Sequence, residues 1–148
     1  MISTLTTLFL ALIYMSNESL AKQRVIAIGQ VICNGKPYDG AIVKLYDKDV
    51  LIDSLMARNQ TLKDGSFYLD GTATDILSKI DPTLYIYHKC NKGSLSCKRE
   101  WIFSIPKDYV YDEKDKKIQP VDVGRWELAV TPKSETFKCL PAKKMVAA

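Results

Sequence analysis

Four cysteines and one histidine are the side chains of this sequence best suited to metal binding or catalysis. They are Cys33, Cys90, Cys97, Cys139 and His88. In an oxidising compartment four cysteines form two disulfides, and three pairings are possible. A zinc site is disfavoured, because the sequence has no C-x-x-C motif and a single histidine cannot complete a familiar ligand set. We therefore expect two disulfides and no metal site.

His88 is the obvious candidate for acid–base catalysis, because histidine titrates near neutral pH. Its neighbours argue for another role. In residues 84–90, β-strand alternation places His88 on one face with Leu84, Ile86 and Cys90. This face is apolar, so we expect a hydrogen-bonded structural histidine. Oxidised cysteines would not serve as nucleophiles, and we predict that the protein is not an enzyme.

The first residues have the pattern of a secretory signal. Residues 5–15 form an uncharged apolar run that is too short to span a bilayer. Polar residues follow, and then Ser19-Leu20-Ala21, whose small residues suit signal peptidase. We expect cleavage after Ala21, so residues 1–21 are a predicted signal peptide and the protein is predicted to be secreted. No later stretch is long and apolar enough to be a transmembrane segment.

The charges argue against one broad class of function. The 148 residues include 21 Lys and Arg and 17 Asp and Glu, a formal net charge of +4. Removal of residues 1–21 takes away one acidic residue, Glu18, and no basic residue, so the charge becomes +5. Basic and acidic residues are interspersed, which is not the pattern of a nucleic-acid-binding protein. In a secreted chain the sequon at Asn59 would be a glycosylation site.

Short apolar segments separated by turn residues predict an all-β fold. We expect about seven strands, at residues 25–33, 41–47, 54–57, 67–70, 84–90, 98–105 and 121–128. The predicted strand at residues 25–33 is apolar on both faces, as in a central strand. The short loop after it suggests that the predicted strand at residues 41–47 pairs with it. Apolar alternation changes sides at Gly124, which predicts a β-bulge. With no strong amphipathic helix, the pattern favours an antiparallel sandwich.

An ordered set of motifs resembles the nematode transthyretin-like family of small secreted proteins. The motifs are Gly29-Gln30-Val31-Ile32-Cys33, Val43-Lys44-Leu45-Tyr46-Asp47, Asp64-Gly65-Ser66-Phe67-Tyr68-Leu69-Asp70-Gly71, Asp81-Pro82, Tyr87-His88-x-Cys90, Ile105-Pro106 and Val121-Asp122-Val123-Gly124. Each motif is weak by itself, but their order and spacing together are specific. The resemblance runs from about residue 29 to residue 128.

The resemblance implies a disulfide-stabilised, transthyretin-like β-sandwich of seven to eight strands over residues 22–130. Family members commonly carry the first two cysteines, which implies pairing of Cys33 with Cys90 and of Cys97 with Cys139. Residues 131–148 would then be a loose tail, tethered through Cys139. The sequence leaves the oligomeric state, monomer or dimer, open.

The family resemblance also implies a secreted, extracellular binding module without a cofactor. The fold occurs in 5-hydroxyisourate hydrolases, but those enzymes use more than one histidine. A plausible role is to bridge a ligand, such as exposed phosphatidylserine, to a cell-surface receptor. Lys89, Lys92, Lys98 and Arg99 are the candidate lipid-headgroup contacts.

Two other functions remain open from the sequence. The protein could carry a small apolar ligand, or it could be a secreted effector that binds a host protein. Outward-facing tyrosines could form a binding patch, although we favour ordinary cross-strand packing as their role. These tyrosines are Tyr46, Tyr68, Tyr85 and Tyr87.

Overall fold

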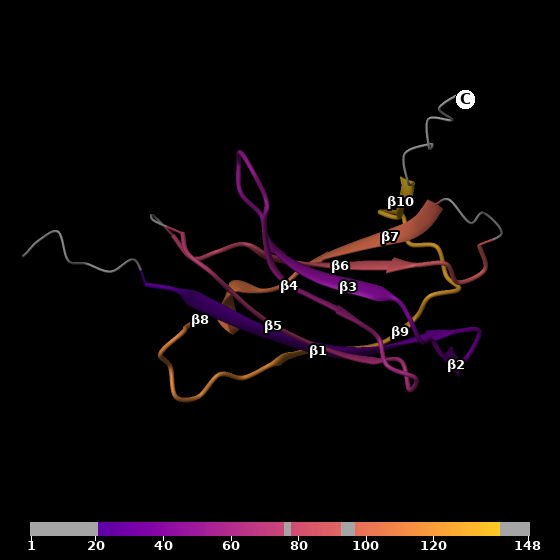
Figure 1. Cartoon of the computed structure of the whole chain (residues 1–148), viewed down its shortest axis with the longest axis horizontal. Helices are drawn as coiled ribbons and strands as arrows, with labels where there is room; N and C mark the ends of the chain where they lie inside the picture. Colours follow the sequence, from indigo (N-terminus) through magenta and orange to yellow (C-terminus); the bar gives the residue numbers. More distant parts are fainter. Residues whose placement is uncertain (1–20, 76–77, 93–96, 140–148) are drawn as a thin grey trace, which may run out of the picture.

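Two five-stranded sheets pack face to face in a computed structural model that describes residues 21–75, 78–92 and 97–139 (Figure 1). The predicted signal peptide, apart from Ala21, lies outside these residues. Sheet A contains β1 (Gln23–Cys33), β2 (Lys36–Pro37), β5 (Ser66–Ala73), β8 (Tyr111–Asp112) and β9 (Val121–Glu127). Sheet B contains β3 (Ile42–Asp47), β4 (Ser54–Gln60), β6 (Pro82–His88), β7 (Cys97–Ser104) and β10 (Thr136–Cys139). The predicted all-β sandwich is confirmed, but the described residues form ten strands and not the seven to eight expected, because the short strands β2, β8 and β10 were not predicted.

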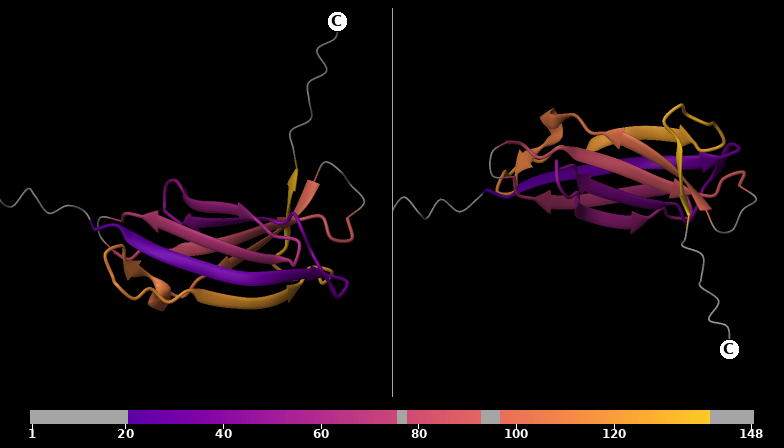
Figure 2. Two further views of the ribbon diagram at one scale, coloured as in Figure 1. Left: turned by 60° about the horizontal axis from the view of Figure 1, so that its bottom comes forward. Right: turned by 90° about the horizontal axis from the view of Figure 1, so that it is seen from above.

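β1 is the central strand of sheet A. It pairs antiparallel with β5 on one side and parallel with β9 on the other, and Figure 2 shows β1 and β9 side by side. The apolar residues on both faces of β1 therefore fit a strand that has a neighbouring strand on each edge. The expected pairing of this strand with residues 41–47 is wrong. The turn after Cys33 returns only the two-residue β2 to β1, and the chain then crosses to sheet B, where β3 pairs with β4 and β6.

The parallel pairing of β9 departs from a purely antiparallel sandwich. The chain leaves β7 in sheet B and passes through a short 3-10 helix, η1 (Lys107–Tyr109), to β8. β8 pairs with the first residues of β1, so β9 starts at the same end as β1 and runs alongside it. The bulge predicted at Gly124 is confirmed, since the β1–β9 register shifts there and Gly124 has a φ of 81°.

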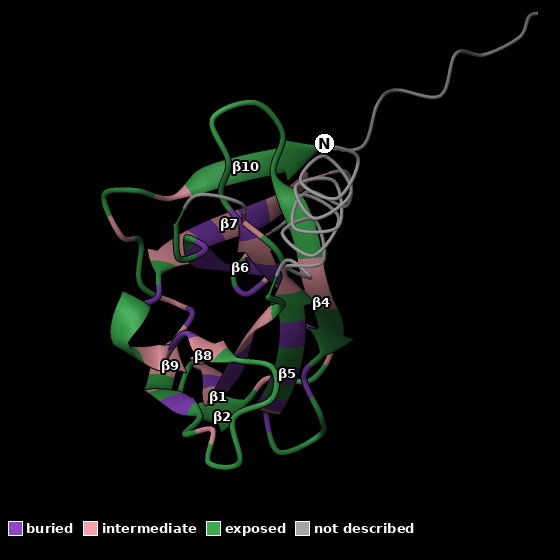
Figure 3. Ribbon diagram, turned by 90° about the vertical axis from the view of Figure 1, so that its left-hand side faces the viewer, coloured by how far each residue is buried: buried purple, intermediate pink, exposed green. Residues whose placement is uncertain are grey.

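β6 lies at the middle of sheet B and every one of its residues is buried. Leu84 and Ile86 are fully buried in the core, where they meet inward side chains of β1 such as Val25 and Val31. Trp101 of β7 is also 1% exposed and is the largest of the fully buried side chains. Viewed end-on, buried residues lie on both sheets around one interior (Figure 3). The alternation predicted for residues 84–90 is confirmed.

Both disulfides implied by the family resemblance are present in the structure. The Sγ atoms of Cys33 and Cys90 are 1.94 Å apart, and this bond joins the end of β1 in sheet A to the residues after β6 in sheet B. Cys97 and Cys139 are joined within sheet B, between β7 and β10. The first bond closes a separation of 57 residues, which stabilises the fold by about 4 kcal/mol in the chain-entropy model.

The segment after residue 131 is more ordered than the expected loose tail. β10 adds to the edge of sheet B by pairing with β7, and just before it the side chain of Glu135, which is 5% exposed, forms an ion pair with Arg99. The sequence suggested only Cys139 as an anchor, because the Pro and Lys content of the segment is typical of a loop. Residues 140–148 lie outside the described part of the chain.

Candidate functional site

The outer face of sheet B gathers basic residues from all five of its strands or their ends. Alternation places Lys44 of β3 opposite Arg58 of β4, and Lys98 of β7 opposite Lys138 of β10. Lys89 follows His88, whose register partner is Arg99, and therefore lies beside Lys98. We call these five residues, Lys44, Arg58, Lys89, Lys98 and Lys138, the basic face.

The basic face carries an electrostatic cost. The pKa of Lys98 is lowered, first by its partial burial and then by repulsion from Lys89, Arg58 and Lys44. Like charges at opposing cross-strand positions are destabilising. An anion bound over this face would offset the repulsion, so the arrangement is suited to an anionic ligand with several charges.

Three tyrosines line the same face. The rings of Tyr46 and Tyr85 meet edge to face at 5.1 Å between centroids, and those of Tyr85 and Tyr87 stack at 6.3 Å. Lys44 Nζ lies 5.2 Å from the centroid of the Tyr87 ring. Tyr85 and Tyr87 are each only 8% exposed, which supports cross-strand packing as their main role.

Tyr87 is a neutral phenol, and Tyr68 lies on the other sheet. Burial, reinforced by the hydrogen bond and the charge of Glu100, raises the pKa of Tyr87 well above its usual value, so this phenol stays neutral. Tyr68 is half-exposed in β5 of sheet A, opposite Ile28, and does not join the other three. The four tyrosines named from the sequence are therefore not one patch.

Arg99 is not available to a lipid headgroup. It is 5% exposed, and its Nε donates to Glu135 at 2.6 Å. Its other nitrogens donate to the carbonyl oxygens of Cys90, Leu128 and Val130. The expectation that Arg99 is an exposed contact is wrong, because Arg99 shares the inward parity of Trp101 on β7 and is held by Glu135 in a later segment.

The other three predicted lipid contacts lie near one end of sheet B. Lys89 and Lys98 belong to the basic face, and Lys92 lies in the β6–β7 turn with its Nζ 3.8 Å from the centroid of the Phe137 ring. Sequence reasoning missed Lys44, Arg58 and Lys138. Strand parity would have found Lys44, which alternates with buried Val43 and Leu45, whereas the pairing of Lys98 with Lys138 depends on the tertiary register.

His88 is a core residue, as its parity predicted, but only one of its ring nitrogens is hydrogen-bonded. Nδ1 accepts the backbone N–H of Cys90 at 3.3 Å, and Nε2 is buried with no hydrogen-bond partner in the described structure. The ring packs edge to face on Trp101. Burial, and then the nearby charge of Arg99, lower the pKa of His88 to about 4. A neutral histidine that is 2% exposed is poorly placed to exchange protons with a substrate.

The predicted glycosylation site is exposed on β4. Asn59 Nδ2 donates to the carbonyl oxygen of Tyr68 at 3.1 Å, which links β4 of sheet B to β5 of sheet A. Thr61 of the same sequon is buried, with its Oγ1 hydrogen-bonded to Tyr38 and Ala41. Occupancy of this site remains a prediction.

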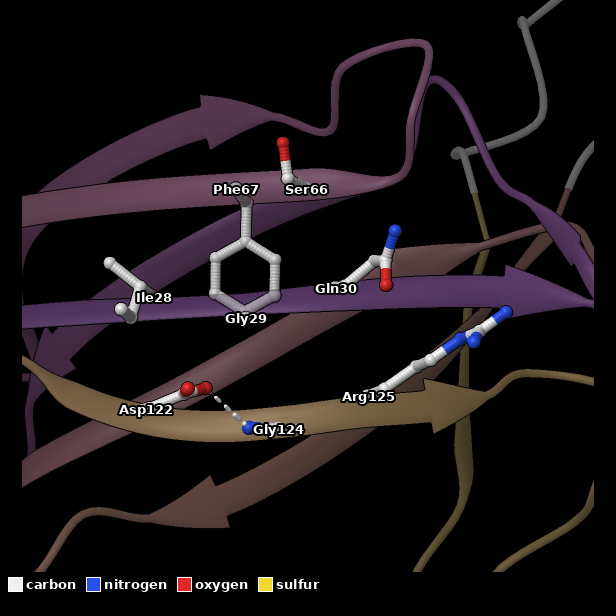
Figure 4. Close-up of a pocket in the computed structure, with 8 residues that line it drawn as sticks. All are labelled: Ile28, Gly29, Gln30, Ser66, Phe67, Asp122, Gly124 and Arg125. Carbon is white, nitrogen blue, oxygen red and sulfur yellow. Dashed lines mark hydrogen bonds between the residues drawn. The ribbon is translucent and has the colours of Figure 1, made fainter.

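A shallow groove of about 390 Å³ lies on the outer face of sheet A, over β1, β5 and β9 (Figure 4). Its floor is low at Gly124, where an added Cβ would meet no atom within 4 Å. Asp122 accepts the N–H of Gly124 at 2.8 Å, and Gln30 donates to the carbonyl oxygen of Asp64. The charged side chains among its lining residues are Asp122 and Arg125. Among the described residues no group of three or more His, Cys, Asp or Glu could hold a metal ion.

No helix in the described part of the chain is long and apolar enough to cross a membrane.

The comparisons with known proteins point to one family. Residues 28–106 match the model of the transthyretin-like family. Transthyretin-like protein 5 of Caenorhabditis elegans is 41% identical over 115 residues, which cover 76% of this chain and 81% of that protein. Transthyretin-like protein 33 is 32% identical over 94% of this chain and 96% of its own length, and transthyretin-like protein 2 is 33% identical over 76% and 79%. Both are also from Caenorhabditis elegans.

Proposed function

This chain belongs to the transthyretin-like family, and from that premise we propose that it is a secreted, non-enzymatic binding protein for an anionic surface. The ligand that we propose is a membrane that exposes phosphatidylserine. The basic face carries this proposal, because five cations gathered on one sheet face suit an array of headgroups better than a single small ion. Each Lys or Arg near such a membrane contributes about 1 kcal/mol.

Secretion is supported by the two disulfides, which persist in oxidising compartments, and by the signal pattern of residues 1–21. The absence of an enzymatic role is supported by His88, whose burial and low pKa suit packing rather than proton transfer.

A bridging role is supported by the two outer faces of the sandwich. The basic face belongs to sheet B, whereas the groove lined by Gln30, Asp122 and Arg125 belongs to sheet A. A membrane on one side would leave the other side open to a receptor. The interior offers less support for a carrier of an apolar ligand, because side chains such as Trp101, Leu84 and Ile86 fill it.

Liposome co-sedimentation tests the proposal. The mature protein is mixed with vesicles of phosphatidylcholine alone or with phosphatidylserine, at low and physiological salt. We expect binding that requires phosphatidylserine and survives physiological salt. The triple change Lys89→Glu, Lys98→Glu and Lys138→Glu should weaken this binding about hundredfold or more, because three contributions of about 1 kcal/mol are lost.

A matched control reverses the same number of charges elsewhere. Lys114, Lys116 and Lys117 are exposed in the loop between β8 and β9, away from sheet B. Their change to Glu should leave most of the binding intact. Equal loss in both triple variants would mean that net charge alone governs binding, and would rule out the basic face as a site.

A further inference from the structure

Three consecutive apolar side chains are exposed at the tip of the β3–β4 loop. Val50, Leu51 and Ile52 have relative exposures of 102%, 93% and 77%. Isolated exposed apolar residues are ordinary, but an uninterrupted set at a loop tip marks an interaction site. In Figure 1 this loop rises from β3 and β4 away from sheet A.

The loop is held in this raised form by its hairpin. The β3–β4 register shifts between Leu45 and Tyr46, and such a bulge bends and twists the strands. At the base of the loop, Asp53 accepts hydrogen bonds from Lys48 Nζ at 3.1 Å and from the N–H of Asp49 at 3.3 Å. These contacts close the neck of the loop without covering the three apolar side chains.

The chemistry of the surroundings indicates what covers the tip. Leu55, which is 52% exposed, lies opposite Tyr46 on the outer face of sheet B, so apolar surface continues from the loop onto that face. The same face carries Lys44 and Arg58 on the two strands that form the hairpin. A convex apolar tip beside a cationic surface complements an anionic bilayer, which offers an apolar interior under negative headgroups.

We propose that Val50, Leu51 and Ile52 insert into the lipid bilayer whose headgroups contact the basic face. This inference rests on the proposed function and adds to it the element that enters the membrane. Asp49 and Asp53 limit the depth, because their carboxylates flank the tip and stay at the level of the headgroups. Insertion is therefore confined to the three apolar side chains.

The first test removes the apolar surface without changing charge. The triple variant Val50→Ser, Leu51→Ser and Ile52→Ser should bind vesicles containing phosphatidylserine at least about tenfold more weakly at physiological salt, because apolar area is no longer buried. Since the three side chains contact solvent, the thermal unfolding curve should be unchanged. The matched control is Leu62→Ser, in the β4–β5 turn, which is 63% exposed and should bind like the parent protein.

The second test reads depth directly. Leu51→Trp places an indole at the tip, and Leu62→Trp places one on a surface that we do not expect to insert. Each variant is compared with the parent protein, whose own tryptophans are Trp101 and Trp126. Lipids brominated on their acyl chains should quench the added emission of Leu51→Trp and not that of Leu62→Trp.

The outcomes separate this inference from the proposed function. If the serine variant binds normally and Leu51→Trp is not quenched, while reversal of the three lysines abolishes binding, then insertion is wrong and the anionic-surface function stands. That result would direct the search to an apolar pocket on a protein partner. If the parent protein shows no preference for phosphatidylserine but raises the surface pressure of a phosphatidylcholine monolayer in a loop-dependent way, insertion stands and the proposed function is wrong.

Discussion

Arg99 shows how one side chain can join distant parts of this sandwich. Its guanidinium on β7 contacts the carbonyl oxygens of Cys90, Leu128 and Val130 and pairs with Glu135, and both charged side chains are about 5% exposed. A buried charge is tolerated only when it is paired and hydrogen-bonded. The ion pair therefore places the segment before β10 against the core.

Removing one charge of the Arg99–Glu135 pair should destabilise the folded protein. Arg99→Met leaves the Glu135 carboxylate without a positive partner, held only by the hydrogen bond from Trp101 Nε1, and leaves several carbonyl oxygens without their Arg99 donor. We therefore expect a loss of about 3–5 kcal/mol in the free energy of unfolding by urea titration. The double variant Arg99→Met and Glu135→Leu should be less destabilised than the single one, because no buried charge remains. Lys138→Met on exposed β10 is the control, with an expected change within about 0.5 kcal/mol.

His88 should make the stability depend on pH. Burial and Arg99 lower its pKa from 6.5 to about 4, whereas Glu135 acts in the opposite direction. Between these values the unfolded chain binds a proton that the folded chain does not. Above about pH 6.5 His88 is neutral in both states and does not make stability depend on pH. As the pH falls from 6.5 toward 4, protonation of His88 in the unfolded chain lowers the free energy of unfolding by up to roughly 3 kcal/mol.

The variant His88→Phe, which cannot titrate, should show a flatter decline between pH 6.5 and pH 4 when urea unfolding is measured at several pH values. Carboxylates that titrate in this window are common to both proteins, so the difference between the two curves isolates His88. Curves of equal steepness would contradict this assignment.

At the scale of elements, the two disulfides hold different kinds of structure. Cys33–Cys90 ties sheet A to sheet B, whereas Cys97–Cys139 ties the four-residue β10 to its neighbour in the same sheet. The separations, 57 and 42 residues, are so similar that the chain-entropy model predicts nearly equal contributions for both bonds. If the two bonds stabilise the protein by different amounts, the difference must come from the parts of the folded protein that each bond connects.

We expect that difference to be large. Replacing Cys33 and Cys90 with Ala should lower the stability of the whole sandwich by about 2–5 kcal/mol. Replacing Cys97 and Cys139 with Ala should cost less, and should speed amide hydrogen exchange in β10 while β6 stays protected. Equal losses of global stability, with no local change in β10, would mean that β10 unfolds together with the rest.

At the scale of the whole molecule, the sandwich separates two kinds of surface. Sheet B presents the basic face and the apolar loop tip, and sheet A presents the shallow groove. Because the two sheets pack through their inner faces, ligands on the two outer faces would not compete for space. A protein that bridges two ligands needs such separate surfaces. Liposome binding tests the surface on sheet B.

Patterns of neighbouring residues were enough to predict much of the local structure. Alternation in residues 84–90 identified which side chains of β6 point inward, and the change of parity at Gly124 identified the bulge. These features depend on neighbours along the chain, which is why they could be read from it. The pairing of the cysteines needed the family resemblance, since composition left three possibilities open.

The positions of the charged side chains depend on how the whole chain packs. Arg99 has the charge of a surface residue, and its burial depends on Glu135, which is 36 residues later in the chain. The basic face joins Lys44 to Lys138 through strands that are far apart in sequence, and β3 lies in the other sheet from β1 despite the short connection. Strand order and register arise from packing of the whole chain, so no local pattern could specify them.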